Sequence, residues 1–173
     1  DIYINSESEL FKPIADQYGV KFYKRPEYLA SDTATNDDFV MDFISNIKCD
    51  VIIQVNPTSP LITVGDVKGF IERKKNCDTL TSVKKEQIEV SYNSKALNFD
   101  IYKQMPRSQW LPPVYLFTSG IMGWDTKSYL ENMKEFGAAV YGVEGKTWYY
   151  TLSGFSTVDI DTEEDFQLAE AII

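Results

Sequence analysis

Hydrophobic and polar positions near the start of the chain alternate between the period of a strand and the period of a helix. Ile2 to Ile4 is a short apolar strand, and Val20 to Tyr23 is another. Between them, Ser6 is a suitable N-cap and Gly19 a suitable stop for a helix that reaches about Tyr18. The first two dozen residues therefore predict a strand, a helix and a second strand.

A longer helix and a buried strand follow. Thr35 or Asn36 can cap the helix, because apolar side chains recur after them at helical spacing. These apolar positions are Phe39, Val40, Phe43, Ile44 and Ile47. The run from Asp50 to Val55 (DVIIQV) is a continuous apolar segment, of the kind found in parallel sheets that are covered on both faces.

The alternation continues after the turn VNPTSPLI, residues 55–62. Thr63 with Asp66 three residues later is typical of a capping box and starts a helix that reaches about Lys75. Thr79 to Val83 supplies the next strand. We therefore predict an α/β fold with a doubly wound, mixed and mostly parallel sheet, whose ligands bind at the carboxyl ends of the strands.

Residues 86–113 break this alternation. The stretch VSYNSKALNFDIYKQM alternates residue types, with NSK as a possible hairpin turn, and the stiff segment WLPPVY follows. We interpret residues 86–113 as an inserted β arm. Because exposed apolar arms usually need a partner, the arm predicts a homodimer.

The remaining pattern returns to short strands and helices. Gly120 to Trp124 is a predicted strand, and Thr126 to about Phe136 is a predicted helix. Short strands are expected around Ala138 to Val143 and at Trp148 to Leu152.

The C-terminal segment STVDIDTEEDFQLAEAII carries candidate chemistry. It predicts a strand that places Asp159 and Asp161 on one face and Ile160 on the other. Thr162 then caps a terminal helix with Asp165 at its third position. Two carboxylates at this spacing can share a divalent cation, whereas the alternative is an acidic helix start that favours the helix dipole. The pattern alone leaves both interpretations open.

The composition of the chain excludes several kinds of partner and of catalytic site. The 173 residues, 43% of them hydrophobic, fit one domain over residues 1–173. The formal net charge of −9 argues against a nucleic-acid partner, because such binding needs clustered Lys and Arg. No membrane span or signal peptide is apparent, so we expect a soluble, cytoplasmic protein. The absence of histidine excludes histidine triads, bases and metal ligands, which leaves carboxylates, metal ions, hydroxyls, Lys, Tyr or the backbone for catalysis.

Four segments resemble, in order and spacing, the motifs of the acylneuraminate cytidylyltransferase family, the CMP-sialic acid synthetases and their relatives. They are RPEYLASDTATNDD (25–38), VNPTSPLI (55–62), PRSQWLPPVYLFTSGIMGW (106–124) and VDIDTEEDFQLAEAI (158–172). The resemblance covers nearly the whole chain and implies a Rossmann-like nucleotidyltransferase fold.

The resemblance also implies a reaction. The anomeric hydroxyl of a nonulosonic acid attacks the α-phosphate of CTP, pyrophosphate leaves, and a CMP-sugar forms for surface glycan synthesis. Such chemistry needs no histidine, because it relies on positioning and on Mg²⁺. Asp159 and Asp161 match the metal-binding aspartates of the family, which favours the metal interpretation of this pair and makes them the expected catalytic residues.

The same resemblance assigns the nucleotide site. Arg25 matches an arginine at the nucleotide, where a fixed planar donor suits the base or the ribose. Asn36 stands where the family commonly has a serine that contacts the nucleotide, and Ala34 is expected to pack close by.

Departures from the family pattern concentrate at the expected sugar site. Asn56 replaces a glutamine, and Ser119 stands where many relatives have asparagine. Arg107 and Gln109 approximate an arginine and glutamine pair. These changes indicate a different sugar or a weakened site, since unmatched buried donors reduce affinity.

A further departure concerns the start of the chain. Neither GxGxxG nor a Walker loop is present, and the family's basic, glycine-containing loop for the CTP phosphates has no counterpart after Asp1. We therefore expect an N-terminally incomplete domain. Two alternatives to the cytidylyltransferase stay open: a sugar nucleotidyltransferase with another substrate, and a degenerate, noncatalytic dimer that binds a sugar.

Overall fold

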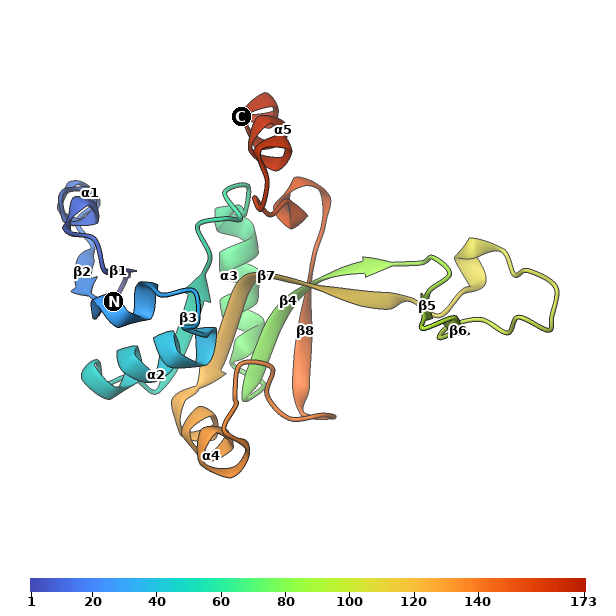
Figure 1. The fold of residues 1–173 in the computed structure, drawn as a ribbon, viewed down its shortest axis with the longest axis horizontal. Coiled ribbons are helices and arrows are strands. Elements are labelled where there is room, and N and C mark those ends of the chain that lie inside the picture. The colour runs from blue at the N-terminus through green and yellow to red at the C-terminus, as the bar shows by residue number, and fades with distance from the viewer.

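A four-stranded sheet forms the centre of the molecule (Figure 1), in a computed structural model that describes all residues 1–173. Its strand order is β3, β7, β4, β8, with the bounds Val51–Val55, Val114–Asp125, Thr79–Glu86 and Thr147–Leu152. β7 runs antiparallel to β3 and β4, whereas β4 and β8 are parallel. Three of the four strands thus share one direction, and the sheet is mixed and mostly parallel, as the alternation of elements predicts.

The first elements form a separate two-stranded sheet (Figure 1). Its strands are β1 (Tyr3–Ser6) and β2 (Lys21–Lys24), which pair in parallel and are joined by the turn η1 (Glu9–Phe11) and helix α1 (Lys12–Tyr18). Ser8 rather than Ser6 caps this connection, through its hydroxyl and the N–H of Leu10. Gly19 ends α1 with a φ of 64°, the left-handed conformation that glycine adopts without steric cost.

Helices cover both faces of the central sheet. Those on one face are α2 (Asn36–Asn46) and α4 (Thr126–Phe136), and α3 (Val64–Lys74) lies on the other. Neighbouring β7 residues divide between the faces: Met122 packs with Val40 of α2 and Tyr129 of α4, whereas Ile121 packs with Phe70 of α3. Each face therefore has its own apolar core.

Capping boxes fix the starts of α2, α3 and α5 (Glu163–Ile172). In each, a threonine hydroxyl accepts a backbone N–H, and an aspartate three residues later accepts the threonine N–H in return. The pairs are Thr35 with Asp38, Thr63 with Asp66, and Thr162 with Asp165. The predicted caps of α3 and α5 are confirmed, and Thr35 is the cap of α2.

Residues 86–113 project from the sheet as an arm (Figure 1). A hairpin of β5 (Ser91–Tyr92) and β6 (Lys95–Ala96) turns at Asn93 and Ser94, both with positive φ, where the NSK turn is predicted. The short helix η3 (Ser108–Trp110) leads back to β7. Large apolar side chains of the arm are exposed: Tyr92, Leu97, Ile101, Tyr102, Met105 and Trp110.

One strand prediction in this region is wrong, and another has the wrong start. Residues 138–143 form no strand, because the N–H groups of Ala139 and Val140 donate to Asp37 Oδ1 at 2.9 and 3.1 Å instead of to a sheet. β7 begins at Val114 rather than Gly120, since its first half pairs with the outer part of β4.

The burial expected for β3 is also wrong at the two ends of the strand. Its neighbour β7 runs antiparallel, and β3 pairs with no strand on its other edge. Val51 and Val55 at its two ends are 45% and 46% exposed, whereas Ile52 and Ile53 pack against the cores on opposite faces, so only the middle of the strand is covered on both faces.

Candidate functional site

Side chains from α2 and β3 meet the backbone of β7 at the carboxyl end of β3. Nε2 of Gln54 donates hydrogen bonds to Oδ1 of Asn36 and to Oδ1 of Asn56, each at 2.8 Å. Nδ2 of Asn56 donates to the Ser119 carbonyl, also at 2.8 Å. We call Asn36, Gln54, Asn56 and Ser119 the amide cluster. It joins one predicted nucleotide residue to two predicted sugar residues.

A bulge in β7 presents the Ser119 carbonyl to Asn56. Pairing between β4 and β7 shifts register here, and Ser119 has a φ of 53°, which is uncommon for a residue other than glycine. Ser82 holds the bulge by accepting the Ile121 N–H at 2.9 Å. A Cβ at Gly120 would lie 2.9 Å from Ser59 Oγ, so glycine permits the turn after β3 to pack closely against the bulge.

The turn VNPTSPLI connects the amide cluster to the C-terminal segment. Ser59 is buried, and its hydroxyl donates to Oδ1 of Asp159 at 3.3 Å. The Thr58 carbonyl accepts the Ile160 N–H at 2.9 Å. A stiff proline-containing turn thus holds one of the two candidate metal ligands beside the carboxyl end of β3.

Asp159 and Asp161 lie in an extended segment that forms no strand. The short helix η4 (Gly154–Thr157) precedes it, and the single backbone hydrogen bond at Ile160 replaces a ladder, so the predicted strand is wrong. Asp161 is exposed, and its carboxylate accepts no hydrogen bond from the chain, whereas its N–H donates to Asp165 at 3.2 Å.

The two carboxylates of this segment suit a magnesium ion that takes its remaining ligands from water and from phosphate oxygens of a substrate. No group of three or more acidic, cysteine or histidine side chains is present, so the chain alone forms no complete metal cage. Magnesium is commonly held by one or two carboxylates together with water and phosphate oxygens. Asp159 and Asp161 meet that requirement if a phosphate supplies further ligands.

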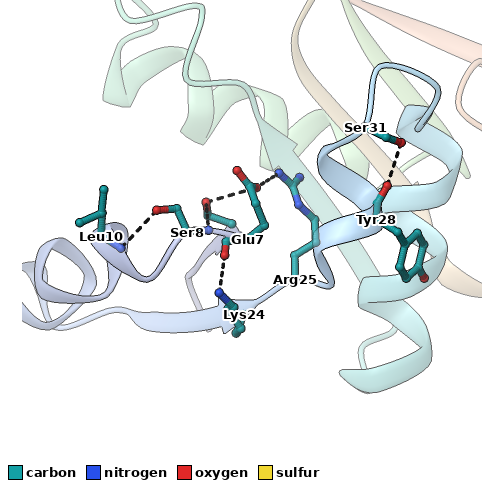
Figure 2. Close-up of polar contacts among 8 residues, drawn as sticks. Glu7, Ser8, Leu10, Lys24, Arg25, Tyr28 and Ser31 are labelled. Carbon is teal, nitrogen blue, oxygen red and sulfur yellow. Dashed lines mark hydrogen bonds and ion pairs between the residues drawn. The ribbon is translucent and has the colours of Figure 1, made fainter.

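Arg25 follows β2 and is held by two contacts, of which Figure 2 shows the one to Glu7. Its guanidinium pairs with the Glu7 carboxylate and lies over the Phe39 ring of α2, 4.6 Å from the ring centroid. The hydrogen bond from Arg25 lowers the pKa of Glu7 below its usual value. Nε of Arg25 is buried without a hydrogen-bond partner. Phe39, which Arg25 contacts, lies one helical turn after Asn36, so Arg25 and Asn36 adjoin the same face of α2.

Ala34 and Asn36 lie at the start of α2. Ala34 is half-buried and donates its N–H to the Ser31 carbonyl at 3.1 Å. Asn36 is the first helical residue, and its Nδ2 is buried without a hydrogen-bond partner. A donor is therefore free at this position.

Arg107 and Gln109 lie in the arm, apart from the other predicted sugar residues. The Arg107 guanidinium lies over the Trp110 ring at 5.3 Å, and the Gln109 carbonyl accepts a hydrogen bond from Gln87 at 3.3 Å. Neither side chain is hydrogen-bonded to the amide cluster. One chain does not bring Arg107 and Gln109 together with Asn56.

Gln54 is a functional candidate that the sequence pattern does not single out, because it lies within the predicted apolar run from Asp50 to Val55. Its place in the strand carried a signal. Residues alternate between faces along a strand, so Gln54 points away from the face of Val55 and Ile53, toward the start of α2.

A groove of about 490 Å³ lies beside the turn on the α3 side, with Asn56, Ser59 and Lys68 among its walls.

Comparison with known proteins gives the family. A family model described as cytidylyltransferase matches residues 1–171. The chain belongs to the cytidylyltransferase family. This membership confirms the resemblance carried by the four sequence motifs.

One curated relative of this cytidylyltransferase chain is the N-acylneuraminate cytidylyltransferase of Streptococcus agalactiae. It is 26% identical over 177 residues, which cover 96% of this chain and 41% of the relative. The chain thus spans less than half the length of that protein.

Two solved structures share the fold. A 4-diphosphocytidyl-2C-methyl-D-erythritol synthase from Anaerococcus prevotii superposes with a TM-score of 0.69 at 12% identity, covering 99% of this chain and 78% of that chain. A CMP:2-keto-3-deoxy-manno-octonic acid synthetase complexed with CTP gives 0.63 at 13% identity, with 99% and 80% covered. The Rossmann-like nucleotidyltransferase fold is confirmed. None of the helices is long and apolar enough to cross a membrane.

Proposed function

We propose that the full-length protein transfers CMP from CTP to a nonulosonic, sialic-acid-like sugar with release of pyrophosphate, which activates the sugar for surface glycan synthesis. The observation that carries the proposal is the convergence around one turn: Gln54 joins Asn36 to Asn56, and Ser59 holds Asp159. Residues assigned to nucleotide, sugar and metal thus share the carboxyl end of β3, where doubly wound sheets bind ligands. The name of the Streptococcus agalactiae relative supports an acylneuraminate-type sugar.

Magnesium is the proposed cofactor, with Asp159 and Asp161 as its ligands from the chain. Bound beside a triphosphate, the ion would neutralise charge that develops on the phosphate oxygens. Ser59 orients Asp159 through its hydrogen bond, and the exposed Asp161 carboxylate is free to take part. The buried donors of Arg25 and Asn36 can meet acceptors of the nucleotide.

A homodimer is the proposed assembly. Besides the exposed apolar residues of the arm, three rings of β7 and β8 and one ring of the loop after α4 form a chain of contacts with centroids 5.3 to 5.8 Å apart, and they stay 42% to 62% exposed. They are Tyr115, Phe117, Tyr141 and Tyr149. A second copy can cover both surfaces. Together they expose a larger apolar area than the isolated apolar residues that are usual on the surface of a monomer. We expect the dimer to act in the cytoplasm, where CTP is available.

Pyrophosphate release tests the function. The full-length protein is incubated with Mg²⁺, each of CTP, UTP, ATP and GTP, and a panel of eight-carbon and nine-carbon keto-acid sugars. We expect release only with CTP and a nine-carbon sugar. Release with another nucleotide or only with an eight-carbon sugar would favour a nucleotidyltransferase of different substrate. Failure with CTP and every nonulosonic acid would reject the proposal and favour a noncatalytic sugar-binding protein.

A further inference from the structure

We propose that Gln54 is a positioning residue that couples the nucleotide half of the site to the sugar half. The inference deepens the proposed function and rests on it. A glutamine side chain has two amide hydrogens, and both hydrogens of Gln54 are used: one bond goes to Asn36 and the other to Asn56, each at 2.8 Å. No other side chain contacts both of these asparagines by hydrogen bonds.

The contact to Asn36 decides which group that residue presents. Because Oδ1 of Asn36 accepts from Gln54, its Nδ2 must point elsewhere, and this nitrogen is buried with no partner in the chain. A buried donor left without an acceptor is destabilising, so such groups in native proteins call for a specific explanation. A ligand acceptor, such as an oxygen of the nucleotide, provides one. Gln54 thereby sets Asn36 as a hydrogen-bond donor.

The contact to Asn56 sets the sugar half in the same way. Oδ1 of Asn56 accepts from Gln54, and its Nδ2 donates to the Ser119 carbonyl in the β7 bulge. The backbone N–H of Asn56 also donates to the Gly120 carbonyl at 2.9 Å. The orientation of the Asn56 amide is therefore tied, through one glutamine, to the orientation of the Asn36 amide, and a change at either end is transmitted to the other.

Gln54→Glu tests this role, because it preserves shape but removes both donors. A carboxylate at position 54 repels the two Oδ1 atoms and favours flipped amides, so that Asn36 would present an acceptor in place of a donor. We expect CTP binding, measured by calorimetry with Mg²⁺ and no sugar, to weaken at least about tenfold, the loss of one hydrogen bond to a buried group. Gln17→Glu, an exposed change of the same charge in α1, is the matched control and should bind CTP normally.

Gln54→Met covers the case in which the glutamate variant does not fold. It removes the donors without adding charge, and the same direction of change is expected. A merely structural glutamine would lower the melting temperature and leave affinity unchanged, so melting temperature and CTP affinity are measured on each variant.

The second measurement tests whether the sugar residue Asn56 and the nucleotide site are energetically coupled through Gln54. In the unaltered protein, Asn56→Ala should change CTP affinity about threefold or more, although Asn56 is assigned to the sugar, because contacting residues in one network are energetically coupled. In the Gln54→Met background the same replacement should have no effect on CTP affinity. Unchanged CTP affinity in both Gln54 variants, or an equal effect of Asn56→Ala with and without Gln54, would overturn the inference. Absence of CTP binding by the unaltered protein would instead overturn the proposed function on which it rests.

Discussion

Asp161 provides the simplest residue-level test of the proposed metal site, because its carboxylate is exposed and accepts no hydrogen bond from the chain. Asp161→Asn removes a charge and little volume, so the fold should be retained. We expect turnover to fall about a hundredfold or more. A metal at a phosphoryl group stabilises the transition state by several kcal/mol, and each tenfold change in rate corresponds to about 1.4 kcal/mol. Steady-state kinetics over a range of Mg²⁺ concentrations measures this change.

Glu164→Gln is the control for Asp161→Asn. Glu164 is also exposed, lies in the first turn of α5 and makes no ion pair, so the same loss of charge should leave turnover unaltered. If Asp161→Asn turns over normally at limiting Mg²⁺, Asp161 is not a metal ligand.

Ser119 gives a second residue-level prediction. Its φ of 53° lies in the left-handed region, which costs most residues roughly 1–2 kcal/mol but which asparagine tolerates better. Ser119→Asn should therefore raise stability by up to about 1 kcal/mol, or about 2–4 °C in melting temperature. Thermal unfolding measures the shift. Ser153→Asn, at an extended residue with a φ of −142°, should give no gain, and an equal gain there would contradict the explanation.

Elements were predictable where their signals are local. The Thr-x-x-Asp caps of α3 and α5 could be located from sequence, because the hydrogen bonds that form them join residues three apart. The expected strand at residues 138–143 failed because Asp37, about a hundred positions earlier, takes the N–H groups of that segment. The link from Gln54 to Asn36 is likewise a tertiary contact, which no spacing in the sequence encodes.

The junction between β1 and β2 gives a prediction about pH. Glu7 follows β1, and Arg25 follows β2; the hydrogen bond from Arg25 lowers the pKa of Glu7 below its ordinary value of 4.5. A carboxyl with a lowered folded-state pKa stabilises the fold fully above its unfolded pKa, and that contribution is lost as pH falls through the folded value. Glu7→Gln should therefore lower stability at pH 7, by no more than about 1 kcal/mol because the pair is partly solvated.

Urea unfolding at pH 7 and at pH 3 measures this pH dependence. The difference between Glu7→Gln and the unaltered protein should shrink toward zero at the lower pH. Glu164→Gln should show no difference at either pH. A Glu7→Gln difference of the same size at both would show that the ion pair is not its source.

At the scale of the whole molecule, the arm determines the expected assembly. Tyr102 and Met105 are 91% and 80% exposed, which predicts that a second copy covers them. The protein should sediment as a dimer, and replacing both residues by aspartate should give a monomer. Leu10→Asp, at an 82% exposed position outside the arm, should remain dimeric. A monomeric unaltered protein at micromolar concentration would contradict the role assigned to the arm.

Membership of the cytidylyltransferase family and the fold are shown, whereas transfer of CMP, the identity of the sugar and the fate of the phosphates make up the central proposal. The most direct measurement uses CTP labelled at its α-phosphate, incubated with Mg²⁺ and a nine-carbon nonulosonic acid. We predict that the label appears in a CMP-sugar while unlabelled pyrophosphate accumulates in equal amount, and that Asp161→Asn slows the formation of both about a hundredfold or more. Label that stays in CTP, or that is recovered in CMP with no sugar attached, would contradict it.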